Sequence, residues 1–457
     1  MMRKSFCALV LLSVIVFAGD VLAEIKADYG AGFRLRQEYW ENVTDLETRG
    51  QPDRDFFRLR SSLWGKIDLN ESFGAYLKLT NEAKYYLGSY RPFLTSDSTS
   101  DDTRFDVDEL VIDNLYVSAK NIFGLPIDLR IGRQDFLGEY GEGFLILDGT
   151  PGDGSRTAYF NAAKASWKIN KSHSVDVLYI SNTNKEEYLP SLYPSRSDSL
   201  SGYVDNKKLL NASDETGVVV YGKSQLNDNI RVEPYYMFKE EDPIGTNSTL
   251  KLNTVGARMV FTATNWKVRG EYAHQFGEYE SHRDRKGNGG YILAGQKFDD
   301  VPLKPEWELG YVYLSGDDPS TSDHEGWNPL FSRAPMWNEL LVYLLLPETI
   351  KDSGPIPAYW TNLHLFKAGV KLALTPDTLL DLQYQYLRAD EATSGLNSAM
   401  FTNGGKERGH LGVFVLSHHF TKRLSGFLQV EYFVPGDFYG DNAKDAILAR
   451  WQLQYRF

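Results

Sequence analysis

The sequence predicts an all-β fold, a single-chain transmembrane antiparallel β-barrel of about 18 strands (16 to 18). Three observations lead to this prediction. Apolar and polar residues alternate with a period of two in many separate segments, which is the pattern of strands with two different faces. The connections between these segments alternate between short and long. The chain holds 25 Phe and 28 Tyr among 457 residues, yet its mean hydropathy is below zero, as expected when aromatic residues are spread over alternating strands.

The carboxy-terminal segment 449–457 alternates apolar and polar residues without a break. Successive side chains of a strand point to opposite faces, so Trp451, Leu453 and Phe457 share an apolar face while Arg450 and Arg456 lie on the other. The segment resembles the terminal signal of bacterial outer-membrane barrels. That resemblance implies two partners, the barrel-assembly machinery and outer-membrane lipid. An ordinary edge strand of a soluble β-sandwich is the alternative.

The amino-terminus has the pattern of a secretory signal peptide. Residues 1–4 are basic, residues 6–18 form an apolar stretch, and Ala23 ends a small-residue cleavage pattern. We therefore expect residues 1–23 to be removed and residues 24–457 to form one outer-membrane barrel domain in a Gram-negative bacterium. The apolar stretch is too short for a spanning helix, and no later stretch approaches the roughly 20 residues that such a helix needs. Cys7, the only cysteine, lies within the signal, which excludes disulfides and thiol catalysis in the mature protein.

Alternation places candidate strands near 28–40, 54–69, 73–84, 106–119, 126–134, 157–169, 173–182, 215–225, 229–239, 250–262, 265–276, 289–299, 305–315, 360–374, 378–388, 409–420, 424–434 and 445–457. Short turns alternate with long connections, the longest being 85–105, 135–156, 183–214, 316–359 and 389–408. This asymmetry is typical of a single-chain outer-membrane barrel, and an even strand count places both termini in the periplasm. Because the first predicted strand begins about five residues after the predicted cleavage site, we expect no plug domain before it.

The alternation also assigns a face to each charged side chain. In the segment 54–69, Leu59 and Leu63 are predicted to face lipid, so Arg58 and Arg60 face the lumen. The same parity gives the following inward cations: Arg34, Arg36, Arg58, Arg60, Lys66, Lys78, Lys84, Arg130, Lys164, Lys168, Arg231, Arg258, Lys267, Arg269, Lys367, Lys371, Arg450 and Arg456. The inward carboxylates are fewer, chiefly Glu38, Asp68, Glu82, Glu233 and Glu271. Acidic residues are instead concentrated in the predicted outer loops, at 97–109, 240–242 and 317–325.

The sequence therefore predicts a basic lumen in a protein whose net charge is −12. Rings of Arg and Lys favour anions in pores, and the guanidinium fork matches carboxylate oxygens. Barrels of 16 to 18 strands leave an aqueous channel, so passage of an anionic solute is expected. The alternative is that these residues merely brace the inner wall. Arg156 and Arg333, from long loops, are further pore-lining candidates. Arg133 is another, although its parity is that of lipid-facing Ile131, so it must lie beyond the membrane rim or follow a bulge.

Several segments resemble the alginate export family of outer-membrane proteins. They are 129–134 (LRIGRQ), 140–143 (YGEG), 148–157 (DGTPGDGSRT), 314–317 (LSGD) and 329–340 (PLFSRAPMWNEL). The resemblance covers most of the mature chain and implies an 18-stranded barrel. It also implies an arginine-lined pore through which an anionic uronate polysaccharide diffuses, with possible periplasmic export partners. A general or small-solute anion-selective porin remains the alternative.

An outer-membrane barrel enzyme is the second alternative, and the sequence offers little for it. The histidines at 173, 274, 282, 324, 364, 410, 418 and 419 form no recognisable catalytic or zinc pattern, and no nucleophile elbow or phosphate-binding loop occurs. Asp148, Asp153, Asp317, Asp318 and Asp323 match no known Ca²⁺ loop, which favours solvated loop acid. We predict no catalytic residues, no metal and no cofactor, and the acidic balance weighs against a nucleic-acid partner.

The loop 316–359 is the longest predicted connection. It contains Trp327, Phe331 and Arg333 and then an apolar run, 336–346, that predicts a short helix between Pro335 and Pro347. An apolar loop of this length is costly to leave in water. We expect it to fold over or into the outer mouth and narrow the pore, with Arg333 facing the conduit. The alternative is a lid that packs on neighbouring loops without obstructing the pore.

Overall fold

The structure is a computed structural model that describes residues 25–51, 53–87, 105–147, 154–157, 160–190, 192, 203–204, 207–332, 337–353 and 359–457. The predicted signal peptide, 1–23, lies outside these residues, as do Arg333, Asp148 and Asp153. None of the helices in the described part of the chain combines the length and apolar character needed to cross a membrane.

Eighteen antiparallel strands form one sheet. They are β1 (Lys26–Glu41), β2 (Arg54–Asp68), β3 (Phe73–Tyr86), β4 (Phe105–Ala119), β5 (Ile127–Gln134), β7 (Phe160–Lys168), β8 (His173–Asn182), β11 (Glu215–Gln225), β12 (Ile230–Glu241), β13 (Leu250–Ala263), β14 (Trp266–Tyr279), β15 (Asp284–Lys297), β16 (Glu306–Leu314), β18 (Leu363–Thr375), β19 (Thr378–Arg388), β20 (Glu407–His419), β21 (Leu424–Pro435) and β22 (Ala446–Arg456).

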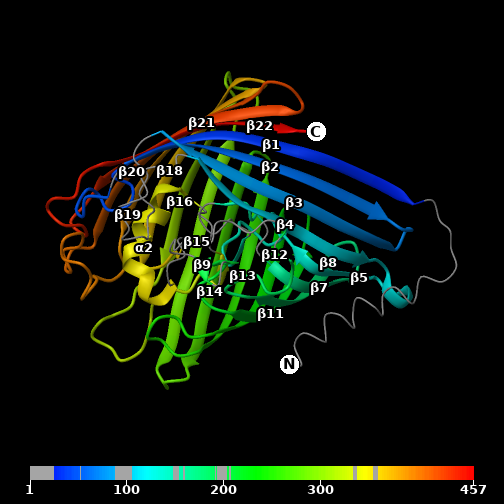
Figure 1. The fold of residues 1–457 in the computed structure, drawn as a ribbon, viewed down its shortest axis with the longest axis horizontal. Helices are drawn as coiled ribbons and strands as arrows, with labels where there is room; N and C mark the ends of the chain where they lie inside the picture. The colour runs from blue at the N-terminus through cyan, green and yellow to red at the C-terminus, as the bar shows by residue number, and fades with distance from the viewer. Residues whose placement is uncertain are drawn as a thin grey trace.

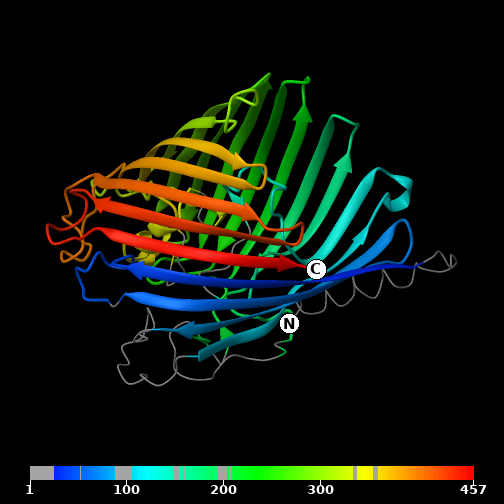
Figure 2. The ribbon, with the colours of Figure 1, turned by 90° about the horizontal axis from the view of Figure 1, so that it is seen from above.

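The sheet closes on itself because the last strand pairs with the first. The register joins Phe33 to Tyr455 and Leu35 to Leu453, and the two strands run side by side in Figure 2, β1 in blue and β22 in red. All the remaining neighbouring strands, taken in chain order, are also paired antiparallel, so the sheet has no open edge. The predicted all-β barrel and its carboxy-terminal closing strand are thus confirmed. We call the end of the barrel with the short connections the turn end and the opposite end the loop end.

The outer wall is apolar where the alternation predicted it. On β1 and β2 the exposed side chains include Tyr29, Phe33, Leu59, Leu63 and Ile67. Large apolar groups on the outside of a closed barrel are the band that contacts lipid. Of the strand boundaries, the largest difference concerns β15, which begins at residue 284 rather than 289, because residues 284–288 continue the ladder with β14.

Shorter elements lie in the connections. They are η1 (Ile122–Gly124), β6 (Ile146–Leu147), β9 (Tyr203–Val204), β10 (Lys207–Lys208), β17 (Phe331–Ser332) and α2 (Leu340–Ser353). The strand β17 pairs in parallel with β6, which joins the long loop after β16 to the loop after β5. Two connections that are far apart in the chain therefore meet inside the ring of strands, where α2 is seen in yellow (Figure 1).

The helix in the long loop differs from its prediction, which placed it at 336–346. It begins at Leu340, where the Glu431 carboxylate accepts the backbone N–H groups of Glu339 and Leu340. It also continues through Pro347, which lacks the N–H of a normal helical turn. Burial of Leu344 and its neighbours against the barrel outweighs that lost hydrogen bond, so tertiary packing overrides the local stop signal.

Candidate lumen site

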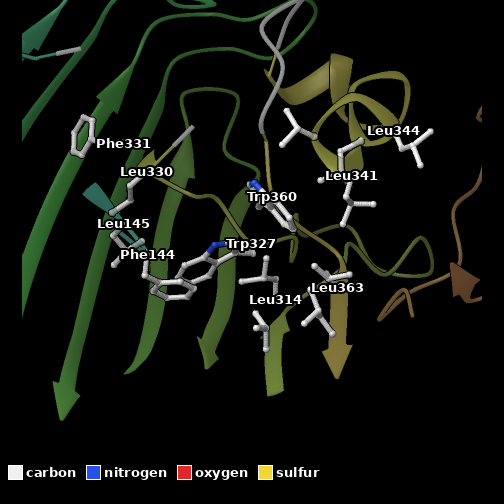
Figure 3. Close-up of a cluster of buried hydrophobic side chains, with 14 of the residues drawn as sticks. Phe144, Leu145, Leu314, Trp327, Leu330, Phe331, Leu341, Leu344, Trp360 and Leu363 are labelled. Carbon is white, nitrogen blue, oxygen red and sulfur yellow. The ribbon is translucent and has the colours of Figure 1, made fainter. Parts of the chain in front are cut away.

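Folded-in loops fill much of the space at the loop end. Trp327 is 1% exposed and its indole stacks on Phe144 with ring centroids 5.2 Å apart. The indole also lies against Gly289 of β15, where an added Cβ would come within 2.7 Å of it. On the other side of the barrel, Tyr343 of α2 packs on Trp40 of β1 at 4.3 Å. Figure 3 shows the cluster of apolar side chains that these loops contribute. Residues 327–332 and 337–353 of this loop thus turn into the barrel, in agreement with the expectation that the loop folds into the mouth.

An open cavity of about 630 Å³ lies on the inner wall of β1, β2, β3 and β22. Four cations line it, and none of its lining residues is acidic. The lining residues are Gly32, Phe33, Arg34, Arg36, Arg60, Ser62, Lys78, Thr80, Thr157, Gln452 and Gln454. We call this the basic cavity. All four of its cations were assigned to the lumen by strand parity.

Carboxylates behind the basic cavity hold its arginines in place. Glu82 is fully buried and accepts contacts from Arg34 at 2.6 Å, Arg58 at 2.7 Å and Arg60 at 3.1 Å. Glu38 accepts contacts from Arg58 at 3.0 Å and Arg36 at 3.2 Å. Four arginines against two carboxylates leave a net charge of +2 (4 − 2) in this group. The carboxylates therefore fix the guanidinium groups without neutralising them.

A short loop segment, 154–157, reaches down onto this wall. The carbonyl of Gly154 accepts a hydrogen bond from Arg60 at 2.5 Å, and the Ser155 hydroxyl accepts one from the Glu82 N–H at 2.8 Å. Thr157 accepts a hydrogen bond from Lys78 Nζ at 2.7 Å. The segment forms one rim of the basic cavity, a contribution that strand parity could not reveal.

Two of the predicted pore-lining arginines are buried and bind a carboxylate of the loop after β8. Arg133 and Arg156 are 6% and 7% exposed, and both donate to Glu186, at 2.6 and 2.7 Å. Burial alone would raise the pKa of Glu186, but the two guanidinium groups hold it down at about 2. Gly132, with a φ of 128°, precedes Arg133, and the pairing of β5 with both neighbours shows no register shift. Arg133 therefore keeps the face of Ile131, beside its register partner Asn161, and no bulge redirects it.

The loop after β5, residues 135–147, projects acid into the lumen. Glu142 accepts contacts from Arg258 at 2.8 Å and from Arg269 at 3.1 Å. Arg269 lies three residues from the start of β14 at the turn end, so this loop descends most of the way through the barrel. Glu139 pairs with Arg130 at 2.7 Å and with Lys164. Burial would raise the pKa of Glu139, but Lys164 and Arg130 lower it below its ordinary value.

Most of the remaining predicted site residues form ion pairs along the inner wall, but Glu271 and Lys267 form none with the described residues. Glu271 accepts hydrogen bonds from Tyr235 and Tyr291 at 2.9 and 3.0 Å. Lys267 is exposed near the turn end. The other pairs are Lys66 with Asp68 (2.8 Å), Arg231 with Glu233 (2.5 Å), Arg258 with Glu233 (3.1 Å), Lys367 with Glu308 (2.9 Å), Lys371 with Asp381 (3.8 Å) and Arg450 with Glu339 (2.8 Å).

A second basic cavity, of about 1030 Å³, opens at the turn end between β7 and β12. Its charged lining residues are Lys168, Lys171, Lys223 and Arg231, joined by His173 and several neutral polar groups. Lys223 pairs with Asp176 at 2.8 Å and lies over the Tyr140 ring at 4.7 Å. Cations thus line both the second cavity at the turn end and the basic cavity.

The expectation that acid is concentrated in the outer loops was too simple. Asp113, Asp176, Glu308 and Glu431 are strand residues that contact inward groups, and the parity of Asp176, Glu308 and Glu431 would have found them. Residues 105–109 of the predicted acidic segment 97–109 belong to strand β4, where Glu109 pairs with Arg156. For carboxylates that reach the lumen from loops, such as Glu142, the sequence offers no alternation from which their position could be predicted. Among the described residues, no group of three or more His, Cys, Asp or Glu side chains is placed to hold a metal ion.

A closed antiparallel barrel with an apolar outer band and charged inner wall defines the class of outer-membrane barrel channels. Within that class, the chain belongs to the alginate export family, whose model matches residues 25–182 and 206–452. No curated protein matches the chain.

Solved structures share the fold at low sequence identity. Pseudomonas aeruginosa OccK8 (OprE) aligns with a TM-score of 0.56 at 10% identity, over 94% of this chain and 98% of that one. OpdK of the same organism, solved with vanillate, aligns with a TM-score of 0.56 at 11% identity and the same coverage. Acinetobacter baumannii OccAB4 aligns with a TM-score of 0.56 at 12% identity, again over 94% and 98%. These similarities support the 18-stranded barrel fold.

Proposed function

We propose that this protein is a passive outer-membrane channel for an anionic polysaccharide of the uronate type, with the turn end and both termini in the periplasm. The observation that carries the proposal is the basic cavity, whose lining contains Arg34, Arg36, Arg60 and Lys78 and no carboxylate. A low-dielectric wall with fixed cations raises the local concentration of anions. Family membership supports a polysaccharide as the solute.

The two basic cavities also support a route for an anion. The second cavity, lined by Lys168, Lys223 and Arg231, lies at the turn end, and the basic cavity on β1, β2, β3 and β22 lies further along the wall. Guanidinium and ammonium groups at both places would hold successive carboxylates of a polyanion only weakly, because most of these cations, such as Arg34 and Lys223, are already paired with protein acid. Weak binding at several positions lets a solute enter and also leave.

A channel for small anionic solutes is the second candidate. Two observations favour it. Residues 135–147, 327–332 and 337–353 occupy part of the lumen, and OpdK, a structure with the same fold, was solved with vanillate, a small carboxylate. Both candidates need an anion-selective lumen, so they differ in the size of solute that the loops admit.

The reversal potential in a salt gradient across a planar bilayer tests the proposal. We expect anion preference that weakens at high salt, block by added oligouronates, and stepwise loss of preference as Arg34, Arg36 and Arg60 are changed to Glu. Arg283 is the matched control: it lies in the connection after β14, its side chain is 39% exposed, and Arg283→Glu should leave selectivity unchanged. Cation preference would refute the proposal. Anion preference without oligouronate block, but with block by small carboxylates, would favour the second candidate.

Compartment and processing have their own test. The protein extracted in detergent should migrate differently on gels before and after boiling, and its mature amino-terminus should begin at Glu24. Deleting Phe457 should reduce assembly into the outer membrane. A folded protein recovered without detergent from the periplasm would contradict the membrane assignment.

A further inference from the structure

Three aromatic side chains form a stack on the inner wall near the turn end. The rings of Trp64 and Tyr76 are 6.1 Å apart with an interplanar angle of 23°, and those of Tyr76 and Tyr116 are 5.2 Å apart at 21°. The Arg130 guanidinium lies over Tyr116 at 5.4 Å from the ring centroid. All three rings are partly exposed. We call this group the aromatic ladder.

The strand register shows that the ladder faces the lumen. Trp64 is paired with Lys78, which lines the basic cavity, and has the parity of Arg60 and Ser62 on β2. Tyr76 is paired with Tyr116 on β4. Interfacial belts of Trp and Tyr lie on the outside of a barrel, so a belt role does not account for rings on the inner wall.

Glycines make room for the flat arrangement. Gly30 of β1 is paired with Trp64, and a Cβ at Gly30 would lie 2.7 Å from the indole ring. Gly132 of β5 is paired with Tyr116, and a Cβ there would lie 2.9 Å from the Tyr116 Cα. The ladder is thus flanked by two positions without side chains, and a side chain at either position would collide with it.

Cations border the ladder. Lys66 is paired with Tyr76, Lys78 with Trp64, and Arg130 covers Tyr116. Ser62, which lines the basic cavity, lies two residues before Trp64 on the same face of β2. The ladder and the basic cavity therefore form one continuous surface, in which flat apolar faces are followed by fixed positive charge.

We propose that the aromatic ladder is a saccharide-binding platform on which pyranose rings of an acidic polysaccharide stack while their carboxylates meet Arg130, Lys78 and Lys66. One face of a pyranose ring carries mainly C–H groups, which gain from contact with an aromatic face, whereas its carboxylate stands at the ring edge, where the bordering cations lie. This inference rests on the proposed function and adds the recognition of the sugar ring to the selection of charge. An inorganic anion would gain nothing from the ladder.

The test compares half-blocking concentrations of a uronate trisaccharide for single channels. Trp64→Leu and Tyr76→Leu keep apolar bulk but lose the flat face, and each should raise the half-blocking concentration about tenfold, equivalent to about 1.4 kcal/mol. Trp64→Phe keeps a flat face and should remain within about twofold of the wild type. Trp266→Leu, on the outer wall at the turn end, is the matched control and should have no effect. The reversal potential should be unchanged in all four variants.

Unchanged block in Trp64→Leu with unchanged anion preference would refute the platform and leave the proposed channel function intact. Loss of anion preference would instead show that charge and not stacking had been disturbed, which also refutes the platform. Quenching of tryptophan fluorescence by the trisaccharide in detergent gives a second measurement that does not need conduction. It should be weaker in Trp64→Phe than in the wild type, and equal quenching would refute the platform.

Discussion

Glu142 offers a direct way to raise the positive field of the lumen without adding a cation. Its carboxylate contacts Arg258 and Arg269, and it comes from the loop 135–147, not from a strand. In Glu142→Gln both arginines keep another acidic partner, Glu233 for Arg258 and Glu308 for Arg269. Neither guanidinium is left unpaired, so the main consequence is the loss of one negative charge from the conduit.

The magnitude follows from Coulomb's law. For a permeating ion about 7 Å from the lost charge in water, the interaction is about 0.6 kcal/mol, and at 0.1 M salt, where the Debye length is about 10 Å, about half of it remains. That energy changes the local concentration of each ion about 1.6-fold, in opposite directions for anions and cations. The ratio of anion to cation permeability should therefore rise about threefold at 0.1 M, and hardly at all at 1 M, where the Debye length is about 3 Å.

The assay is the reversal potential of the purified channel in planar bilayers at 0.1 M and 1 M salt. Glu278→Gln is the matched control, because Glu278 is exposed near the loop end, on the face of β14 that also carries Tyr272 and Phe276. It should leave the ratio unchanged. A permeability ratio for Glu142→Gln that equals the wild-type ratio at 0.1 M would refute the assignment of residues 135–147 to the conduit. A threefold rise that persists at 1 M would refute its electrostatic cause.

Three further predictions concern the loops. Trp327→Ala removes a fully buried indole, an effect of about 3–5 kcal/mol on the packing of its loop, and should increase single-channel conductance, whereas equal conductance would leave that loop no part in narrowing the pore. Because the folded-state pKa of Glu186 is lowered to about 2 from 4.5, its ion pair with Arg156 stabilises the loop fully above about pH 4.5 and is lost as the pH falls towards 2. Protection of the amides of residues 183–189, measured relative to their intrinsic exchange rates, should fall over that interval, and constant protection would contradict the pairing. Glu431→Ala leaves the buried N–H groups at the start of α2 without an acceptor, at about 1–3 kcal/mol each, so α2 should exchange faster and the melting temperature fall, while unchanged exchange of α2 would contradict this anchoring role.

The strands and their faces could be predicted from the sequence because strand periodicity is local. Each side chain of a strand takes its face from its place in the alternation, so Leu59 and Leu63 lie outside while Arg58 and Arg60 contact inward partners. The closing strand that ends at Arg456 was evident for the same reason. The loop motifs around 129–157 and 314–340 supported the family assignment, which the match over 25–182 and 206–452 establishes.

What the alternation could not give was the content of the lumen. The alternation placed Trp64 in a strand but did not predict its stacking with Tyr76 and Tyr116. That stacking depends on the register of three strands and on the glycines beside them. Nor could the alternation reveal that Arg133 and Arg156 share the Glu186 carboxylate, because that carboxylate belongs to a loop.

The sequence by itself thus determined the barrel, its two faces and the cations of the inner wall, since these depend on residues two positions apart. Only the tertiary structure decided how those cations are paired and which part of the lumen stays open. Glu142 and Glu186 meet their arginines from loops and not from strands, and α2 continues through Pro347 because its apolar side chains are buried. Such contacts join residues far apart in the chain, and their energy depends on the shape of the closed barrel, which no local pattern records.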